Sequence, residues 1–281
     1  MIYQYTTIEA LAQILKNQTI RFSRLDQVDD LEEGAIESQS IKLSKFLFVS
    51  CWTESREESI PLWKLYSGNK GGVRIGLEKD MFLDYYIEDI IVGGKKVFGS
   101  GLSKIPREEI LDKDYWIPPI FKSDMSVFYR KVRYVDDVTS ELSNVVKREE
   151  TESKTVFSDG ETRKNAKLTF ETSILGAIKN KRWEFEDESR FTIFIFPGNP
   201  LKYPTGPMVE RLYSNFINDK GIPFTYYDLH LNPTAFESME ITMSPSSLPG
   251  QRIIVESLCS QYAPKAIIRD SNLKDLVKLK E

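Results

Sequence analysis

The sequence predicts an α+β fold in which antiparallel strand pairs and flanking helices form a single domain over residues 1–281. Strands and helices alternate irregularly, the strands are rich in aromatic residues, and several strand pairs are separated only by turns. Neither GxGxxG after a strand nor GxxxxGK[ST] occurs, so a doubly wound parallel sheet is not favoured. Hydrophobic residues make up 41% of the 281 positions, which is ample for a core.

The first 80 residues contain the clearest elements. After a strand at 2–6, apolar residues recur at helical spacing behind a candidate N-cap at Thr6 or Thr7, which predicts a helix over 6–17. Further strands are expected at 19–23, 45–53 and 72–78, with helical stretches near 31–43 and 58–68 between them.

The middle of the chain is less regular and is expected to carry insertions near 93–125 and 140–165. The first insertion is rich in glycine and proline. The second contains the charged run 147–164, most simply a solvated helix end and surface loop. The remaining predictions are strands at 126–135, 225–231, 238–244 and 264–270, and helices at 166–180, 248–262 and 271–279.

Residues 182–196, RWEFEDESRFTIFIF, join charged residues to a buried strand. Alternate side chains of a strand point to the same face. Glu186, Glu188 and Arg190 would therefore line one side of a strand that enters the core. This pattern suits either a functional site or an ion-pair row on a half-exposed edge strand.

The composition limits the chemistry. The net charge of −4 and the pI near 5.4 give no global basic field of the kind that marks a dedicated nucleic-acid binder. With His230 as the single histidine, and Cys51 and Cys259 far apart in sequence, neither a zinc site nor a histidine-based triad is expected. The N-terminus lacks the pattern of a signal peptide and no window approaches a membrane span, so a cytoplasmic protein that does not enter a membrane is predicted.

Short motifs spread along nearly the whole chain resemble a known family. They comprise Tyr3, Tyr5, Thr6, Ile14, Leu15, Asn17, Thr19 to Ser23, Asp29, Asp30 and Glu33; then Ser50, Cys51, Trp52, Leu62, Trp63, Tyr66 and Gly72; then Asn180, Trp183, Glu186, Glu188 and Arg190; and the C-terminal stretches ITMSPSS and PKAIIRDS. In this order they resemble the bacterial domain-of-unknown-function family 2971.

That family is in turn similar, more remotely, to ADP-ribosyltransferases of the His-Tyr-Glu kind. The resemblance implies a split antiparallel sheet with flanking helices and a cleft for NAD. It places Gln4 at the position of the histidine, Ser50 and Tyr66 in the middle motifs, and Glu186 or Glu188 at the position of the catalytic glutamate. Gln4 is a departure, because an amide can donate and accept hydrogen bonds but cannot titrate.

The expected site follows from this resemblance and from the chemistry of the residues. We expect Glu188 to be the main catalytic carboxylate, with Glu186 assisting it and no metal at the site. Arg21 or Arg74 could hold the pyrophosphate, and Trp63 could equally be core packing. The residues expected to bind NAD are Gln4, Tyr5, Thr6, Arg21, Ser50, Trp63, Tyr66 and Arg190.

The resulting prediction is an NAD-dependent ADP-ribosyltransferase that modifies a macromolecule, either protein or nucleic acid. NAD would be its substrate, and a role as a bacterial toxin or anti-phage effector would imply a neutralising antitoxin partner. Three alternatives are an NAD glycohydrolase, a catalytically silent nucleotide-sensing module, and a magnesium-dependent nuclease. The nuclease would use Asp29, Asp30 and Glu33.

Overall fold

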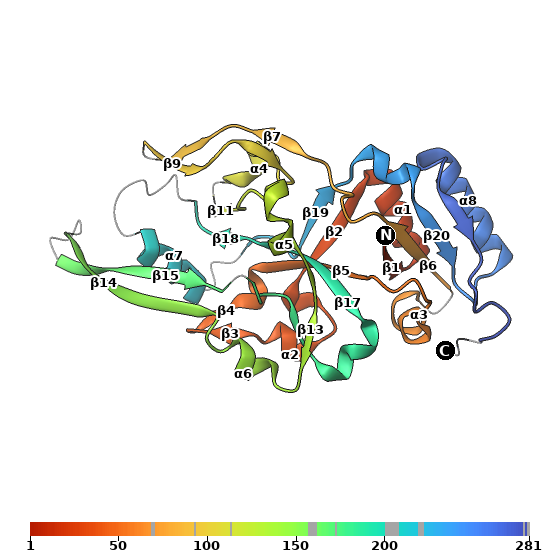
Figure 1. Cartoon of the computed structure of the whole chain (residues 1–281), viewed down its shortest axis with the longest axis horizontal. Helices are drawn as coiled ribbons and strands as arrows, with labels where there is room; N and C mark the ends of the chain where they lie inside the picture. The colour runs from red at the N-terminus through yellow and green to blue at the C-terminus, as the bar shows by residue number, and fades with distance from the viewer. Residues whose placement is uncertain are drawn as a thin grey trace.

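A mixed β-sheet forms the centre of the computed structural model, which describes residues 1–68, 71–92, 94–112, 114–156, 162–171, 173–199, 208–218, 222–277 and 279 (Figure 1). Within these residues the sheet has nine strands. In spatial order, seven of them are β12 (Tyr129–Lys131), β17 (Glu188–Phe194), β5 (Leu47–Thr53), β1 (Ile2–Thr6), β6 (Val73–Leu77), β20 (Glu240–Met243) and β21 (Ile267–Arg269). The other two are β2 (Thr19–Arg24), which pairs with β5, and β19 (Tyr226–His230), which pairs with β2.

The α+β class is confirmed, but the sheet is mixed, whereas a split antiparallel sheet was predicted. Strands β20 and β21 are parallel. Helix α8 (Pro249–Tyr262) connects them, and a crossover helix of this length allows the chain to return in the same direction. A second parallel pair joins β13 (Arg133–Val135) to β16 (Ile178–Asn180) outside the main sheet.

The main sheet opens beside β5, because one edge of this strand is shared by two partners. The other edge pairs with β17 along its whole length. On the shared edge, β1 meets β5 at Thr53, whereas β2 meets it at Val49 and Phe48. The main chain at Cys51 lies between these contacts and faces the opening, since its carbonyl accepts a hydrogen bond from the Gln4 side chain across the gap.

Shorter elements surround this sheet. The remaining strand pairs are β3 (Glu37–Ser38) with β4 (Ile41–Lys42), β7 (Tyr85–Ile87) with β10 (Gly101–Ser103), β8 (Ile90–Val92) with β9 (Lys95–Phe98), β11 (Tyr115–Trp116) with β18 (Phe196–Pro197), and β14 (Val146–Val156) with β15 (Thr162–Phe170). The other helices are α1 (Ile8–Asn17), α2 (Leu31–Gly34), α3 (Ile60–Tyr66), α4 (Arg107–Ile110), α5 (Met125–Phe128), α6 (Val138–Leu142) and α7 (Met208–Ile217). Short 3₁₀ helices are η1 (Leu25–Gln27), η2 (Leu43–Lys45), η3 (Lys122–Asp124), η4 (Lys181–Glu186) and η6 (Pro233–Glu237).

Helix α1 forms as its sequence predicts. The Thr7 side chain accepts a hydrogen bond from the Ala10 amide and caps the helix, and the residues at helical spacing are buried. The helix packs against α8 on one face of the sheet (Figure 1). It connects β1 to β2, so it fixes the two strands that diverge along β5.

Several predictions for the irregular segments are wrong. The predicted helix at 31–43 ends at Gly34, and residues 272–276 form turns instead of a C-terminal helix. Strands β14 and β15 form a hairpin where a surface loop and a helix over 166–180 were predicted (Figure 1). Threonines occur repeatedly in this stretch and favour strands. The tip of the predicted 140–165 insertion, residues 157–161, and residues 93 and 113 of the 93–125 insertion lie outside the described residues.

The two faces of the main sheet differ in chemistry. Residues opposite each other in a sheet share a face, and Glu188 lies opposite Thr53 while Arg190 lies opposite Cys51. The next residue, Phe191, points to the other face, where its ring centroid lies 4.9 Å from that of Phe82. Strand β17 therefore separates an aromatic core from a row of charged side chains.

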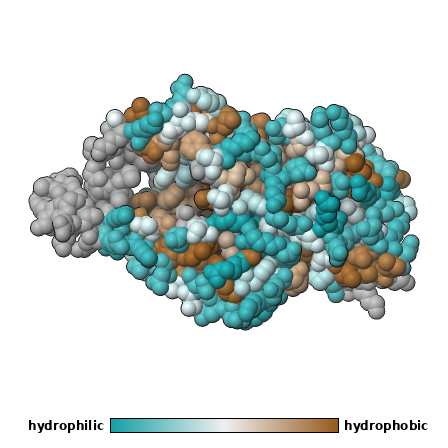
Figure 2. Space-filling view, in the orientation of Figure 1, coloured by the Kyte–Doolittle hydropathy of each residue, from teal (hydrophilic) through white to brown (hydrophobic). Residues whose placement is uncertain are grey.

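The visible surface is largely hydrophilic, with hydrophobic residues in separate patches (Figure 2). Among the described residues, no helix has the length and apolar character needed to cross a bilayer.

Candidate functional site

A cavity of about 260 Å³ lies at the opening between β1 and β5. Glu188 and Arg190 reach it from β17, but Glu186 ends the 3₁₀ helix η4 and is not part of the strand. Asp187, with a left-handed φ of 45°, turns the chain between them. The prediction that all three charged residues lie on one strand is therefore wrong for Glu186. The cavity is lined by Tyr3, Gln4, Tyr5, Ser23, Gln27, Val28, Asp29, Cys51, Trp52, Thr53, Leu62, Tyr66, Lys179, Glu186, Glu188 and Arg190.

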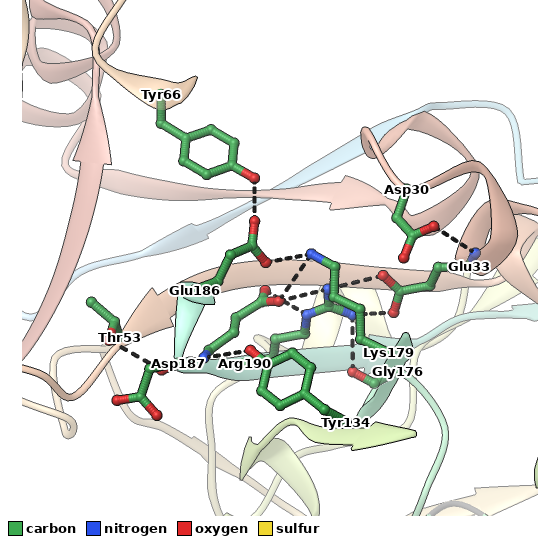
Figure 3. Close-up of polar contacts among 11 residues, drawn as sticks. Asp30, Glu33, Thr53, Tyr66, Tyr134, Gly176, Lys179, Glu186, Asp187 and Arg190 are labelled. Atoms are coloured by element: carbon green, nitrogen blue, oxygen red, sulfur yellow. Dashed lines mark hydrogen bonds and ion pairs between the residues drawn. The ribbon is translucent and has the colours of Figure 1, made fainter. Parts of the chain in front are cut away.

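Arg190 is held between two carboxylates at the base of the cavity (Figure 3). Its Nε and Nη2 atoms lie 2.6 and 2.9 Å from the two carboxylate oxygens of Glu188. On its other side the guanidinium donates to both oxygens of Glu33, and Nη1 also donates to the Gly176 carbonyl at 3.3 Å. Glu33, Arg190 and Glu188 are 0%, 1% and 4% exposed. Paired hydrogen bonds of this kind fix both position and orientation.

Lys179 joins this trio to Glu186 (Figure 3). Its ammonium lies 2.5 Å from Glu186 Oε2 and 3.4 Å from Glu188 Oε2, so it bridges the two carboxylates. The Tyr66 hydroxyl donates to the other oxygen of Glu186 at 2.5 Å. Both oxygens of Glu186 are thus oriented, one by a cation and one by a phenol.

The two glutamates at the cavity have opposite pKa shifts. Burial raises the pKa of Glu188, but the charges of Arg190 and Lys179 outweigh burial and lower it to about 2. Burial and the charge of Glu188 raise the pKa of Glu186 above its ordinary value. Burial likewise raises the pKa of Tyr66, and its hydrogen bond to Glu186 raises it further, so the phenol stays a donor. Glu188 is a fixed anion, whereas Glu186 is the group poised to exchange a proton.

The buried network carries an excess of negative charge. Among the described residues, three carboxylates (Glu33, Glu186 and Glu188) make ion pairs with two cations (Lys179 and Arg190). An uncompensated buried charge is unfavourable. The raised pKa values of Glu33 and Glu186 are consistent with this excess. The cavity therefore favours a ligand or a transition state that carries positive charge.

The lowered pKa of Glu188 predicts how the stability of the fold depends on pH. Its folded pKa lies below the ordinary 4.5, so the unfolded chain binds more protons as the pH falls from about 4.5 to about 2. The stability that Glu188 contributes is present above pH 4.5 and is lost through this range. Urea denaturation of the wild type and Glu188→Gln should show a free-energy difference that changes between pH 6 and pH 3. If the difference in the free energy of unfolding is constant over that range, the pKa of Glu188 is not lowered in the folded protein.

Six of the predicted site residues meet at the cavity. Glu186, Glu188, Arg190, Gln4, Tyr5 and Tyr66 all line it. The Gln4 amide donates to the Cys51 carbonyl at 3.0 Å. The Tyr5 ring packs edge-on against Trp63, and its hydroxyl accepts a hydrogen bond from the Ser59 amide.

The other four predicted site residues do not line the cavity. They are Thr6, Arg21, Ser50 and Trp63. Trp63 is fully buried and its indole donates to Glu58, so it is core packing. Ser50 is buried and accepts a hydrogen bond from the Trp52 indole, while Thr6 lies beyond the lining residues of β1. Arg21 lies on β2 opposite Asp228, forms two hydrogen bonds with that carboxylate, and stacks 3.8 Å over the Tyr226 ring.

Three participating residues were not predicted to take part in this site. Lys179 lies on β16, in a stretch that was predicted to be helical. Glu33 was taken for a residue at a helix start or in a metal site, yet it is the second partner of Arg190. The Tyr134 hydroxyl accepts a hydrogen bond of 2.8 Å from the main-chain amide of Glu188 and so positions the start of β17.

Two of the three acidic residues considered for a metal site, Asp30 and Glu33, have structural roles, whereas Asp29 lines the cavity. Both carboxylate oxygens of Glu33 accept hydrogen bonds from Arg190. Asp30 is the N-cap of α2, and its side chain accepts hydrogen bonds from the main-chain amides of Glu32 and Glu33. In the described part of the chain, no group of three or more histidine, cysteine or carboxylate side chains is placed to hold a metal ion. This arrangement does not support a nuclease that binds magnesium through Asp29, Asp30 and Glu33.

The comparisons with known proteins find one family model, which matches part of the chain. Residues 62–191 match the family described as "Protein of unknown function (DUF2971)", which confirms the resemblance seen in the sequence motifs. The matched range runs from Leu62 to Phe191 and so includes the lining residues from α3, β16 and β17. No curated protein and no solved structure matches the chain.

Proposed function

We propose that the cavity cleaves the bond between nicotinamide and ribose in NAD and transfers ADP-ribose to a macromolecule. The observation that carries this proposal is the pair of carboxylates with opposite pKa shifts, Glu186 and Glu188, at one cavity. Two titratable groups whose pKa values are pushed apart divide the roles of proton acceptor and fixed charge.

The charge of the site suits this reaction. Breaking the glycosidic bond leaves its electron pair on nicotinamide and develops positive charge on the ribose. Glu188, held ionised by Arg190 and Lys179, would stabilise that charge. The excess negative charge of the buried network also complements the cationic nicotinamide ring of NAD.

Glu186 has the features of a base that activates the acceptor. Its raised pKa brings it nearer to the working pH than an ordinary glutamate. A bond would form between the ribose carbon and the acceptor oxygen, and the acceptor proton would pass to Glu186. Tyr66 would hold the carboxylate in place through its 2.5 Å hydrogen bond.

The size of the cavity bears on how NAD would bind. Enclosed sites for ligands of drug size are about 300–1,000 Å³, and this cavity is about 260 Å³. It therefore suits the nicotinamide and its ribose, with the adenosine part outside. Tyr3, Tyr5 and Tyr66 offer aromatic faces to a cationic ring.

A cytoplasmic location, a protein or nucleic-acid acceptor, and a neutralising partner are further parts of this proposal. If water replaced the acceptor, the same residues would act as an NAD glycohydrolase. A silent nucleotide-binding module would bind NAD without releasing nicotinamide.

The proposal is tested with NAD labelled in its adenylate part, incubated with purified protein and cell extract. The wild type is expected to release nicotinamide and label a macromolecule, and Glu186→Gln to be slower by roughly 10²–10⁴-fold. Glu237→Gln, at an exposed ion pair with Lys265, is the matched control and should behave like the wild type. Label found only in free ADP-ribose would indicate hydrolysis. Equal rates for the wild type and Glu186→Gln, or no nicotinamide release, would overturn the proposal.

A further inference from the structure

An open groove of about 340 Å³ adjoins the cavity. Its walls come from the residues at the start of α2 and from η4. Asp29 lines both the groove and the cavity, so the two spaces are continuous at this residue. Trp183 lines the groove, and its ring centroid lies 4.5 Å from the Lys179 ammonium, which reaches the cavity. A ligand in the groove would therefore lie directly beside the cavity.

The walls of the groove carry two carboxylates that have no cation as a partner. Within the described residues, Arg182 is the one cation that lines the groove, and it pairs with Glu32 at 2.9 Å. Asp29 is exposed and makes no hydrogen bond or ion pair in the described part of the chain. Asp30 is 4% exposed; its Oδ1 accepts two main-chain amides, but its Oδ2 has no hydrogen-bond partner among these residues. Because a buried charge without compensation is unfavourable, the groove favours a cationic ligand.

The same groove has an apolar part, which consists of Leu31, Trp183 and Phe185. Leu31 is 84% exposed and Phe185 is 43% exposed, so two large hydrophobic side chains face solvent beside the carboxylates. Exposed hydrophobic residues that are bordered by polar groups often mark an interaction site. Aromatic faces attract cations, and the methylene groups of lysine and arginine pack against apolar surface. The combination suits a lysine or arginine side chain.

We propose that this groove binds a lysine or arginine side chain of a polypeptide partner, with its charged group beside Asp29 and Asp30. A free small cation would leave Leu31 and Phe185 exposed, whereas the partner residues that flank the bound side chain can cover them. The same two carboxylates would repel the phosphates of a nucleic acid. The binding does not depend on the reaction proposed for the cavity, and its test uses no NAD.

The experiment compares two peptides by isothermal titration calorimetry with the full chain. The first is acetyl-Gly-Leu-Arg-Leu-Gly-amide, and the second has citrulline, which is similar in shape but neutral, in place of arginine. The wild type is expected to bind the arginine peptide at millimolar concentration. It should bind the citrulline peptide roughly tenfold more weakly or worse, because hydrogen bonds between charged groups are lost.

A first variant removes charge from the groove without removing the cap of α2. Asparagine caps a helix about as well as aspartate, so Asp30→Asn should fold like the wild type. It should weaken binding of the arginine peptide roughly tenfold and change binding of the citrulline peptide little. Asp137→Asn, the same change at the exposed N-cap of α6, is the matched control and should bind both peptides like the wild type.

A second variant places a positive charge in the groove. Leu31 is 84% exposed, so Leu31→Lys should keep the thermal stability of the wild type while it repels the arginine peptide and abolishes its binding. Leu276→Lys, at a leucine that is 77% exposed and does not line the groove, is the matched control.

Several results would overturn the proposal. The wild type must bind the arginine peptide at millimolar concentration and prefer it to the citrulline peptide. The proposal also fails if either Asp30→Asn or Leu31→Lys binds the arginine peptide like the wild type, or if the two control variants lose binding as well. Displacement of the peptide by a single-stranded RNA of ten uridines would point to a nucleic acid instead, and equal affinity for butylguanidinium would point to a free small cation.

Discussion

Arg190→Met is expected to destabilise the fold by roughly 3–5 kcal/mol, the cost of breaking a buried ion pair by removing one partner. Arg190 is 1% exposed and donates to both carboxylate oxygens of Glu33 and of Glu188. Methionine would fill much of the volume but leave both carboxylates buried without their main partner. The free energy of unfolding, measured by urea denaturation at pH 7, checks this expectation.

Two further variants separate the buried network from the general effect of losing an arginine. Arg133→Met removes an exposed ion pair with Glu141 and should cost no more than about 1 kcal/mol. Adding Glu33→Gln to Arg190→Met should recover part of the loss, because it removes one of the two buried charges that lose Arg190 as a partner. If Arg190→Met costs as little as Arg133→Met, the network does not stabilise the fold as its geometry indicates.

Glu188→Gln is expected to slow nicotinamide release from NAD by roughly 10²–10³-fold, the usual effect of removing one group that stabilises transition-state charge. The variant should still fold but be less stable at neutral pH, because it lacks the stability that ionised Glu188 contributes there. The variant leaves two carboxylates, Glu33 and Glu186, facing Lys179 and Arg190, so the network becomes electrically balanced. The measurement is the rate of nicotinamide release at saturating NAD, with urea denaturation of the same variant as a check on folding.

The pH dependence of nicotinamide release by Glu188→Gln tests whether Glu188 acts as a fixed charge and Glu186 as the proton acceptor. The charge of Glu188 is one cause of the raised pKa of Glu186. Its removal should therefore lower the pKa of Glu186 and move the acidic limb of the residual rate profile to lower pH. An unshifted profile with an unchanged rate would show that Glu188 does not act at the reacting centre. Glu237→Gln, which changes an exposed carboxylate paired with Lys265, is again the matched control.

The sequence predicts those parts of the fold that depend on local pattern. Helix α1 has both a cap and helical spacing, and β5 is a strongly apolar segment, so each is evident within about ten residues. The hairpin of β14 and β15 has no periodic signal of this kind, because its charged residues follow neither period clearly. Its threonines favour strands, but no local pattern shows that the two strands pair with each other.

The sequence predicts only part of the candidate site, because a local pattern shows only residues that are close to one another in the chain. Glu186, Glu188 and Arg190 stand out because they are close in sequence. Glu33 lies 157 positions from Arg190, and no local pattern shows that the two side chains pair. Arg21 has the charge expected of a phosphate ligand, but the neighbouring strand supplies Asp228 as its partner. Such long-range partners become visible only when the order of the strands is known.

The opening beside β5 has a consequence for how this protein can change through evolution. The cavity lies where two strands diverge from one shared edge, and α1 connects these two strands. Its presence therefore depends on main-chain geometry, whereas its chemistry depends on side chains such as Gln4, Tyr66 and Glu186. Substitutions at these positions can change the chemistry of the cavity while the cavity itself persists. Proteins that share a scaffold of this kind can thus differ in function.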